Sequence, residues 1–122
     1  GSLSVGGLAA LYERCAVVVS NDTGPLHLAG AVGAAAVGIF WCGNLLNYGP
    51  VDRSRHRPLV SWRQRCPGCG RTMLEGCDDA TPFVADITVP EVAAEALDLL
   101  SRPRSSALDG RASGRAGADR RP

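Results

Sequence analysis

Residues 16–41 read AVVVSNDTGPLHLAGAVGAAAVGIFW, and this stretch decides the fold. Two continuous apolar runs, residues 16–20 and 35–41, flank a polar turn and a second apolar segment. Short runs without alternation are typical of parallel strands that are buried on both faces. Between them, Pro25 suits the first turn of a helix over residues 25–32, which Gly33 can end. The order strand, helix, strand predicts an α/β domain with a Rossmann-like parallel sheet.

Weaker signals lie on both sides of this unit. Before it, Ser4 can cap an amphipathic helix over residues 5–14, and Cys15 is expected to be a buried apolar residue. After it, residues 42–82 show no sustained periodicity. Such a long irregular segment inside a small domain is usually functional, or it hides an element. Residues 83–85 are compatible with a short strand.

The last part of the chain divides into a helix and a tail. Thr88 and Glu91 form a capping-box pattern that predicts a helix over residues 89–101. The expected apolar face of this helix is Val92, Ala96, Leu99 and Leu100. Residues 102–122 are mostly Arg, Gly, Ser, Ala and Pro, with a net charge of +4, whereas residues 1–101 carry −3. We therefore expect one domain over residues 1–101 and a disordered basic tail over residues 102–122.

Composition sets limits on the class of protein. The chain has 122 residues, of which 45% are hydrophobic and 20% charged, so it fits one small domain with a packed core. Its apolar runs are far too short to cross a bilayer. The chain begins Gly1-Ser2 and its single Met is Met73, so we expect the domain to be truncated at its N-terminus.

The turn between the first strand and its helix holds the sharpest chemical motif. In parallel sheets, ligands bind beyond the carboxyl ends of the strands, where a helix N-terminus offers free N–H groups to an anion. Gly24 lets a phosphate approach the backbone, Thr23 adds a hydroxyl donor, and Pro25 fixes the first helical turn. Asp22 would repel a phosphate, so it suits sugar hydroxyl groups, and His27 can donate to an oxygen at the same end. The equally weighted alternative is that Asp22 or Thr23 caps the helix and His27 is a packed histidine.

These residues resemble a known family. The run from Ala16 to Ala31, with the Asp22-Thr23-Gly24-Pro25-Leu26-His27 motif, closely resembles the C-terminal domain of the heptosyltransferase-like enzymes of glycosyltransferase family 9. A looser likeness extends over residues 1–101. The resemblance implies part of the C-terminal domain of a GT-B enzyme, in which this domain binds a nucleotide-diphosphate sugar. It implies that Thr23 and Gly24 contact the donor phosphate, and that Asp22 and His27 lie near the transferred sugar.

The resemblance also implies a reaction. Inverting hexosyl or heptosyl transfer without a metal needs a base for the acceptor hydroxyl and stabilisation of the leaving diphosphate. The base is expected in the N-terminal, acceptor-binding domain, so we expect no catalytic residue and no activity in this chain alone. No cofactor and no nucleic-acid partner are expected. A cytoplasmic role in cell-envelope or lipopolysaccharide glycan synthesis follows from the same likeness, which allows peripheral contact with the inner face of the membrane.

Three cysteines raise the question of a metal. Cys66 and Cys69 are separated by two residues, Cys77 follows eight residues later, and Cys42 or His56 are available as a fourth zinc ligand. A strong zinc signature has a second paired motif, which this sequence lacks. Reduced thiols or an occasional disulfide are therefore favoured, and zinc is the minor alternative.

Two further groups are candidates for ligand contact. Asn44 and Asn47 follow the second strand at the expected ligand-binding edge, with the alternative of a packed loop around a core Trp41. A basic segment contains Arg53, Arg55, His56, Arg57, Arg63 and Arg65. These cations suit phosphate groups or a membrane surface, but a solvated loop without acidic partners is the favoured interpretation.

Two competing functions stay open from the sequence. One is a small zinc-stapled module that binds nucleic acid or protein, with nucleic acid held through residues 53–71. The other is an inactive truncated remnant, in which the opening helix and the first strand lack the sheet partners they need. The identity of the sugar, the nucleobase and the acceptor has no signal in these residues.

Overall fold

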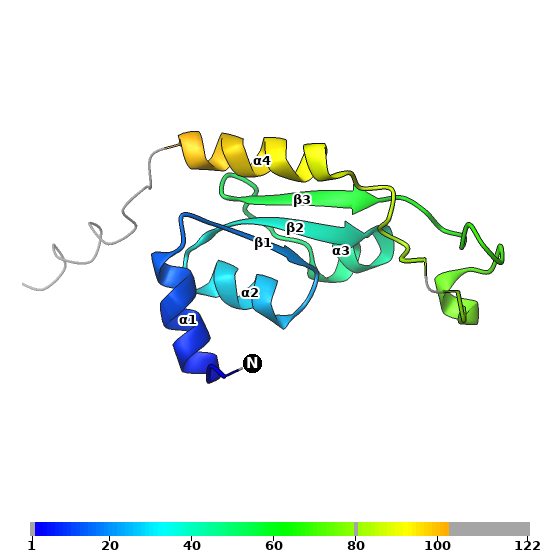
Figure 1. Ribbon diagram of the computed structural model, residues 1–122, viewed down its shortest axis with the longest axis horizontal. Coiled ribbons are helices and arrows are strands. Elements are labelled where there is room, and N and C mark those ends of the chain that lie inside the picture. Colours follow the sequence, from blue (N-terminus) through cyan, green and yellow to red (C-terminus); the bar gives the residue numbers. More distant parts are fainter. Residues whose placement is uncertain (1, 80, 103–122) are drawn as a thin grey trace, which may run out of the picture.

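Three parallel strands form the centre of the structure (Figure 1). The computed structural model describes residues 2–79 and 81–102. The strands β1 (Val17–Asn21), β2 (Ala35–Trp41) and β3 (His56–Ser61) lie in the order β1-β2-β3. The register pairs Val17 with Ala35 and Ala36 with His56. The predicted α/β fold with a parallel sheet is confirmed.

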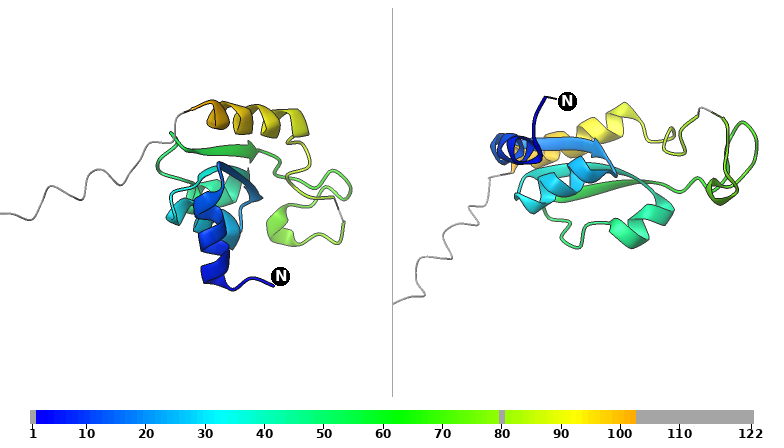
Figure 2. Two further views of the ribbon diagram at one scale, coloured as in Figure 1. Left: turned by 60° about the vertical axis from the view of Figure 1, so that its left-hand side comes forward. Right: turned by 90° about the horizontal axis from the view of Figure 1, so that it is seen from below.

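The described part of the chain contains four α-helices beside this sheet. They are α1 (Val5–Arg14), α2 (Gly24–Ala31), α3 (Cys42–Tyr48) and α4 (Val89–Ser101). Figures 1 and 2 show α4 on one face of the sheet and α2 on the other. Among the described residues, no helix has the length and apolar character needed to span a membrane. Apart from Arg102, the tail predicted over residues 102–122 lies outside the described residues.

The alternation of side chains along β2 creates two separate core clusters. On the α2 face, Leu26, Ala36 and Phe40 are buried together with partly buried Leu45. On the α4 face, the buried cluster is Ala35, Val37 and Leu99, with Val17, Leu59, Val92 and Ala96 packed against it. Leu100 is 53% exposed, so its predicted place on the apolar face of α4 is wrong.

The glycine in the middle of β2 is required by this packing. A Cβ atom added at Gly38 would lie 2.6 Å from both the Leu26 and the Phe40 side chains. Real Cβ atoms do not come this close to other heavy atoms, so any larger residue must displace the core. The glycine therefore allows α2 to approach the centre of the sheet.

Residues 42–82 are less irregular than their sequence indicates, because they contain α3, β3 and a short 3-10 helix, η1 (Met73–Glu75). The strand β3 includes Pro58, which cannot donate a ladder hydrogen bond. It is tolerated because β3 lies at the edge of the sheet within the described part of the chain. After β3, residues 62–79 project away from the sheet in both views of Figure 2, and we call this segment the cysteine loop.

Three local predictions are wrong. Residues 83–86 form a turn and not a strand, with the Ala85 N–H donating to the Pro82 carbonyl oxygen at 3.1 Å. β1 is an edge strand of the described sheet, so Val19 is 49% exposed although burial of both faces was expected. Cys15 is half-buried, because it packs at the margin of the cluster formed by Val18, Ala29 and Ala34.

The amino-terminal cap of α4 adds a pH-dependent contribution to stability. The Thr88 hydroxyl and the Thr88 N–H each donate to Glu91 Oε2 at 2.7 Å. The side-chain bond first, and then the backbone bond, lower the pKa of Glu91 below its ordinary value. Because the folded-state pKa is below the unfolded-state pKa, the contribution is complete above the unfolded-state pKa. It is lost as the pH falls through the folded-state pKa.

We therefore expect Glu91→Gln to flatten this part of the pH profile, because glutamine keeps an oxygen acceptor and does not titrate. Wild type should be more stable than the variant at neutral pH, and the difference should shrink as the medium is acidified. Urea unfolding followed by circular dichroism, from about pH 7 to pH 3, measures it. Parallel pH profiles for the two proteins would contradict this role of Glu91.

Candidate functional site

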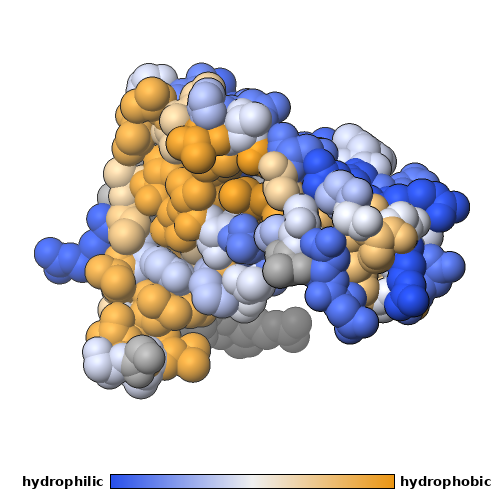
Figure 3. Space-filling view, turned by 45° about the vertical axis from the view of Figure 1, so that its right-hand side comes forward, coloured by the Kyte–Doolittle hydropathy of each residue, from blue (hydrophilic) through white to orange (hydrophobic). Residues whose placement is uncertain are grey.

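A cavity of about 500 Å³ lies at the carboxyl ends of β1 and β2. The sheet and α3 contribute Asn21, Asp22, Ile39, Trp41 and Asn44 to its wall. The opposite wall is Met73, Cys77, Asp79, Thr81, Pro82, Phe83 and Val84. This is the edge at which open parallel sheets bind ligands. Figure 3, with the cysteine-loop side turned forward, shows mostly hydrophilic residues on the projecting part and apolar residues gathered over the body.

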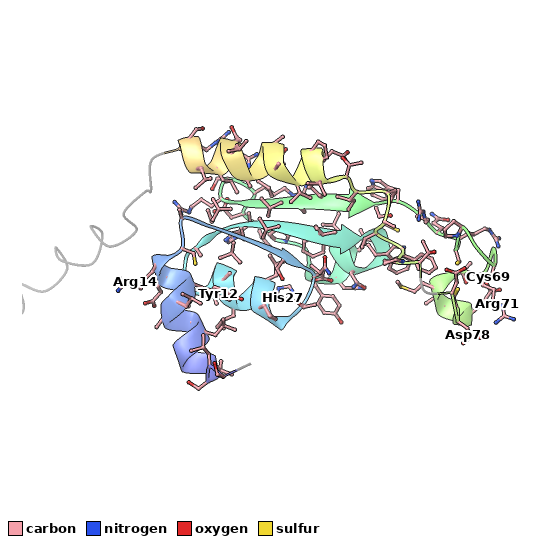
Figure 4. All side chains as sticks on the ribbon, in the orientation of Figure 1. Tyr12, Arg14, His27, Cys69, Arg71 and Asp78 are labelled. Atoms are coloured by element: carbon pink, nitrogen blue, oxygen red, sulfur yellow. The ribbon has the colours of Figure 1, made fainter. Side chains whose placement is uncertain are left out.

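Asp22 and His27 form a pair at this edge. The Asp22 N–H donates to the Ile39 carbonyl oxygen at 2.9 Å, which continues the sheet by one bond beyond β1. Its carboxylate Oδ1 lies 3.0 Å from His27 Nε2. The Asp22 side chain is 8% exposed and that of His27 49%, so the imidazole covers the carboxylate. Figure 4 shows His27 on α2, near the end of β1. His27 itself lines a second, smaller cavity of about 190 Å³.

The N-terminus of α2 begins directly after Asp22. Thr23 occupies the N-cap position, but its side chain makes no cap bond and its hydroxyl donates to the Asn21 carbonyl oxygen at 3.2 Å. The alternative in which the Thr23 side chain caps the helix is therefore wrong. The Leu26 and His27 N–H groups donate to the Thr23 carbonyl oxygen at 3.0 and 3.4 Å. Because Pro25 has no N–H, the Gly24 N–H is the main donor that the first turn keeps for a ligand.

The two asparagines of α3 have different positions. Asn44 lines the large cavity, whereas the Asn47 amide is exposed and donates to the Gly43 carbonyl oxygen at 3.2 Å. Trp41 is half-buried and lines the large cavity. It also holds the start of the cysteine loop, because its Nε1–H donates to the Arg63 carbonyl oxygen at 2.7 Å. Its ring meets Phe83 edge-on, with centroids 6.3 Å apart.

The basic segment does not form one cationic surface. Arg57 pairs with Asp98 at 3.1 Å and lies 4.0 Å from Glu95, both on α4, so the expectation that its arginines have no acidic partner is wrong here. Arg65 donates to the Gly70 carbonyl oxygen at 3.1 Å within the cysteine loop. Arg53 is exposed, and Arg55 and Arg63 are half-buried. Arg57 therefore helps to hold α4 against the sheet, and Arg65 stabilises the cysteine loop.

The two additional zinc ligands suggested by the sequence lie elsewhere. His56 is at the start of β3, where its Nε2 lies 3.2 Å from the Ala34 carbonyl oxygen. Cys42 is buried at the start of α3. Within the described residues, the group of metal-ligating side chains that come together is Cys66, Cys69 and Cys77.

The comparison with family models decides the classification. The model of glycosyltransferase family 9 (heptosyltransferase) matches residues 1–74, which is more than half of the chain. The chain belongs to glycosyltransferase family 9. The comparisons with curated proteins and with solved structures gave no match. The family 9 match spans α1 to β3, and residues 75–101 lie outside it.

Membership of family 9 makes this a glycosyltransferase sequence, and it argues against the nucleic-acid module. The sequence predicted one wall of the cavity through Asp22 and Asn44. It did not predict the opposite wall, from Met73 to Val84, because this segment has no sustained periodicity. The one available signal was its length, since long loops in small domains are often functional.

Proposed function

We propose that the large cavity binds a nucleotide-diphosphate sugar for inverting, metal-independent hexosyl or heptosyl transfer. The observation that carries this proposal is the placement of Asp22. Asp22 lines the cavity at the carboxyl ends of the strands, and the N-terminus of α2 follows it at the same edge. One site thus offers an acceptor for sugar hydroxyl groups beside donors for a diphosphate.

The first turn of α2 is the proposed phosphate site. The positive end of the helix dipole, the Gly24 N–H and the Thr23 hydroxyl act together on the anion, and the Thr23 O–H would turn to it from the Asn21 carbonyl oxygen. A Cβ added at Gly24 would meet no protein atom within 4 Å, so the fold itself does not require glycine here. Its absence of a side chain leaves the backbone open to a phosphate oxygen. The same donors would stabilise the nucleotide diphosphate as it leaves.

Asp22 and His27 are proposed to act on the sugar as a unit. One carboxylate oxygen of Asp22 is held by His27, which leaves the other to accept hydrogen bonds from sugar hydroxyl groups. Because His27 lines the smaller cavity, its proposed role is to orient Asp22. Asn44 contributes an amide to the same cavity.

The remaining chemistry belongs to parts outside this chain. The base is proposed to be an acidic residue of an N-terminal domain that binds the acceptor, in a GT-B arrangement. The chain alone would then bind the donor without transferring the sugar. A cytoplasmic location, with peripheral contact at the inner face of the membrane and no nucleic-acid partner, completes the proposal.

A ligand panel tests this function. We expect one nucleotide-diphosphate sugar from a panel of purine and pyrimidine donors to raise the melting temperature of the chain, with or without added Mg²⁺. Thr23→Ala should weaken its binding about tenfold or more, because a hydrogen bond to a charged group is lost. Titration calorimetry measures the affinities.

The two amides of α3 provide a matched control. Asn44→Ala should weaken binding, whereas Asn47→Ala, from the same helix but outside the cavity, should leave it unchanged. Equal effects of the two substitutions would place the ligand elsewhere. A panel in which no nucleotide sugar changes the melting temperature would overturn the proposal.

A further inference from the structure

The strongest unassigned cluster in the molecule lies on the cysteine loop. The Sγ atoms of Cys66, Cys69 and Cys77 all lie within 4.8 Å of one another, and those of Cys69 and Cys77 are 3.1 Å apart. Cys66 is 3% exposed, Cys77 is half-buried and Cys69 is exposed. Three convergent sulfurs with one open side have the form of a site that a solvent ion can enter.

The backbone around Cys66 forms a compact turn beside the three sulfurs. The Cys66 N–H donates to the Arg71 carbonyl oxygen at 2.7 Å, and the Gly70 N–H donates to the Cys66 carbonyl oxygen at 2.9 Å. Gly70 has φ 74°, a conformation that favours glycine. The backbone N–H groups of Cys69 and Gly68 point at the Cys66 sulfur.

As thiolates, the three sulfurs need a cation between them. The Asp79 N–H donates to Cys77 Sγ at 3.3 Å. Three thiolates at this spacing repel one another unless a cation lies between them. A divalent ion removes this repulsion and replaces the shared protons, which are released on binding.

The loop also lacks the apolar contacts that normally order a segment of its length. Between residues 62 and 79, Cys66 is the single buried residue. Leu74 is 92% exposed and Trp62 67% exposed. Small units without a hydrophobic core depend on a disulfide or a metal. Beyond the hydrogen bonds that Trp41 and Arg65 make to its backbone, the cysteines are the groups available to cross-link this loop.

We propose that Cys66, Cys69 and Cys77 bind a Zn²⁺ ion as three thiolate ligands. Zinc prefers tetrahedral sulfur sites with bonds of about 2.3 Å, which separate the sulfurs by about 3.8 Å. The cluster needs only a small adjustment to reach this spacing. Three thiolates and one Zn²⁺ carry a net charge of −1, and Arg65 and Arg71 lie on the same loop. Figure 4 labels Arg71 there. The fourth position is left to water or an exchangeable ligand.

The site has a structural consequence that is independent of the proposed function. Met73, Cys77 and Asp79 form part of the wall opposite Asp22. Zinc would therefore fix the outer wall of the large cavity. Removing it should loosen the loop while the sheet stays folded, because no core cluster includes a residue of the loop.

Metal analysis of the whole chain, purified under reducing conditions, is the direct test. We expect about one zinc per chain, and tetrahedral cobalt absorption with thiolate charge-transfer bands after exchange with Co²⁺. Cys69→Ser and Cys77→Ser should each lose most of the bound metal. Cys15→Ser, which changes a half-buried thiol beside α1, should keep it.

A second measurement needs no variant. Chelation should accelerate tryptic cleavage at Arg65 and Arg71 without loss of helical circular dichroism, and added Zn²⁺ alone should restore the protection. Reduced protein without bound metal, or zinc that survives Cys77→Ser, would overturn the proposal. So would an intact mass that is two hydrogens lower with Cys69 and Cys77 joined, because the cluster would then be a disulfide.

Discussion

Replacing Phe40 with alanine is expected to lower the free energy of unfolding by about 3–5 kcal/mol. Phe40 is 1% exposed and is the largest fully buried side chain of the described residues. It fills the space between β2 and α2, in the cluster with Leu26 and Ala36 against which Leu45 packs. Alanine would leave a cavity in this layer, and the small sheet has no second aromatic residue there to fill it.

Urea unfolding, followed by circular dichroism, measures this loss. Leu46→Ala is a suitable control, because Leu46 belongs to the neighbouring α3 but is 85% exposed. It should change the free energy of unfolding by less than about 0.5 kcal/mol. Similar midpoints for Phe40→Ala and wild type would show that the α2 face is not a packed core.

Leu99→Ala is the second substitution with a large expected effect, a loss of about 2–5 kcal/mol. Leu99 is 6% exposed and packs on Ala35 and Val37, so it is the central apolar anchor of α4. The ion pair between Arg57 and Asp98 holds the same helix, but both side chains are partly exposed. Partly exposed ion pairs contribute little, so they cannot replace the lost packing.

Leu97, two residues earlier on the same helix, provides the matched comparison. It is 65% exposed. Leu97→Ala and Leu99→Ala change the intrinsic helix propensity of α4 by the same amount, because both replace leucine with alanine. We expect Leu97→Ala to unfold at nearly the wild-type urea concentration. Equal destabilisation by the two variants would mean that helix formation, and not docking on the sheet, controls their stability.

The sequence predicted the parts of the fold whose local pattern agrees with their final environment. The runs around Val18 and Val37 became the first two strands, and Thr88 begins α4 as its capping box predicts. β3 was missed because His56, Arg57 and Pro58 give it no apolar periodicity. Its strand geometry comes from pairing with β2, which is a tertiary effect.

The candidate site was predicted to a similar extent. Asp22 and Asn44 could be placed at the cavity because residues that follow parallel strands share one edge. The partner of Asp22 could not be deduced from spacing alone, since His27 lies five positions later, across a turn. The far wall depends on Trp41, whose indole holds the backbone at Arg63, 22 residues later. No local pattern carries such a contact.

The agreement between strand order and chain order affects how the protein is made. Each parallel pairing closes one short crossover, so β2 can join β1, and β3 can join β2, while the chain leaves the ribosome. The helix that covers Ala35 and Val37 is synthesised last among the described elements. Until Leu99 has emerged, one face of the nascent sheet stays in water and is a target for chaperones. Translation of α4 therefore ends the period in which the growing chain can aggregate through that face.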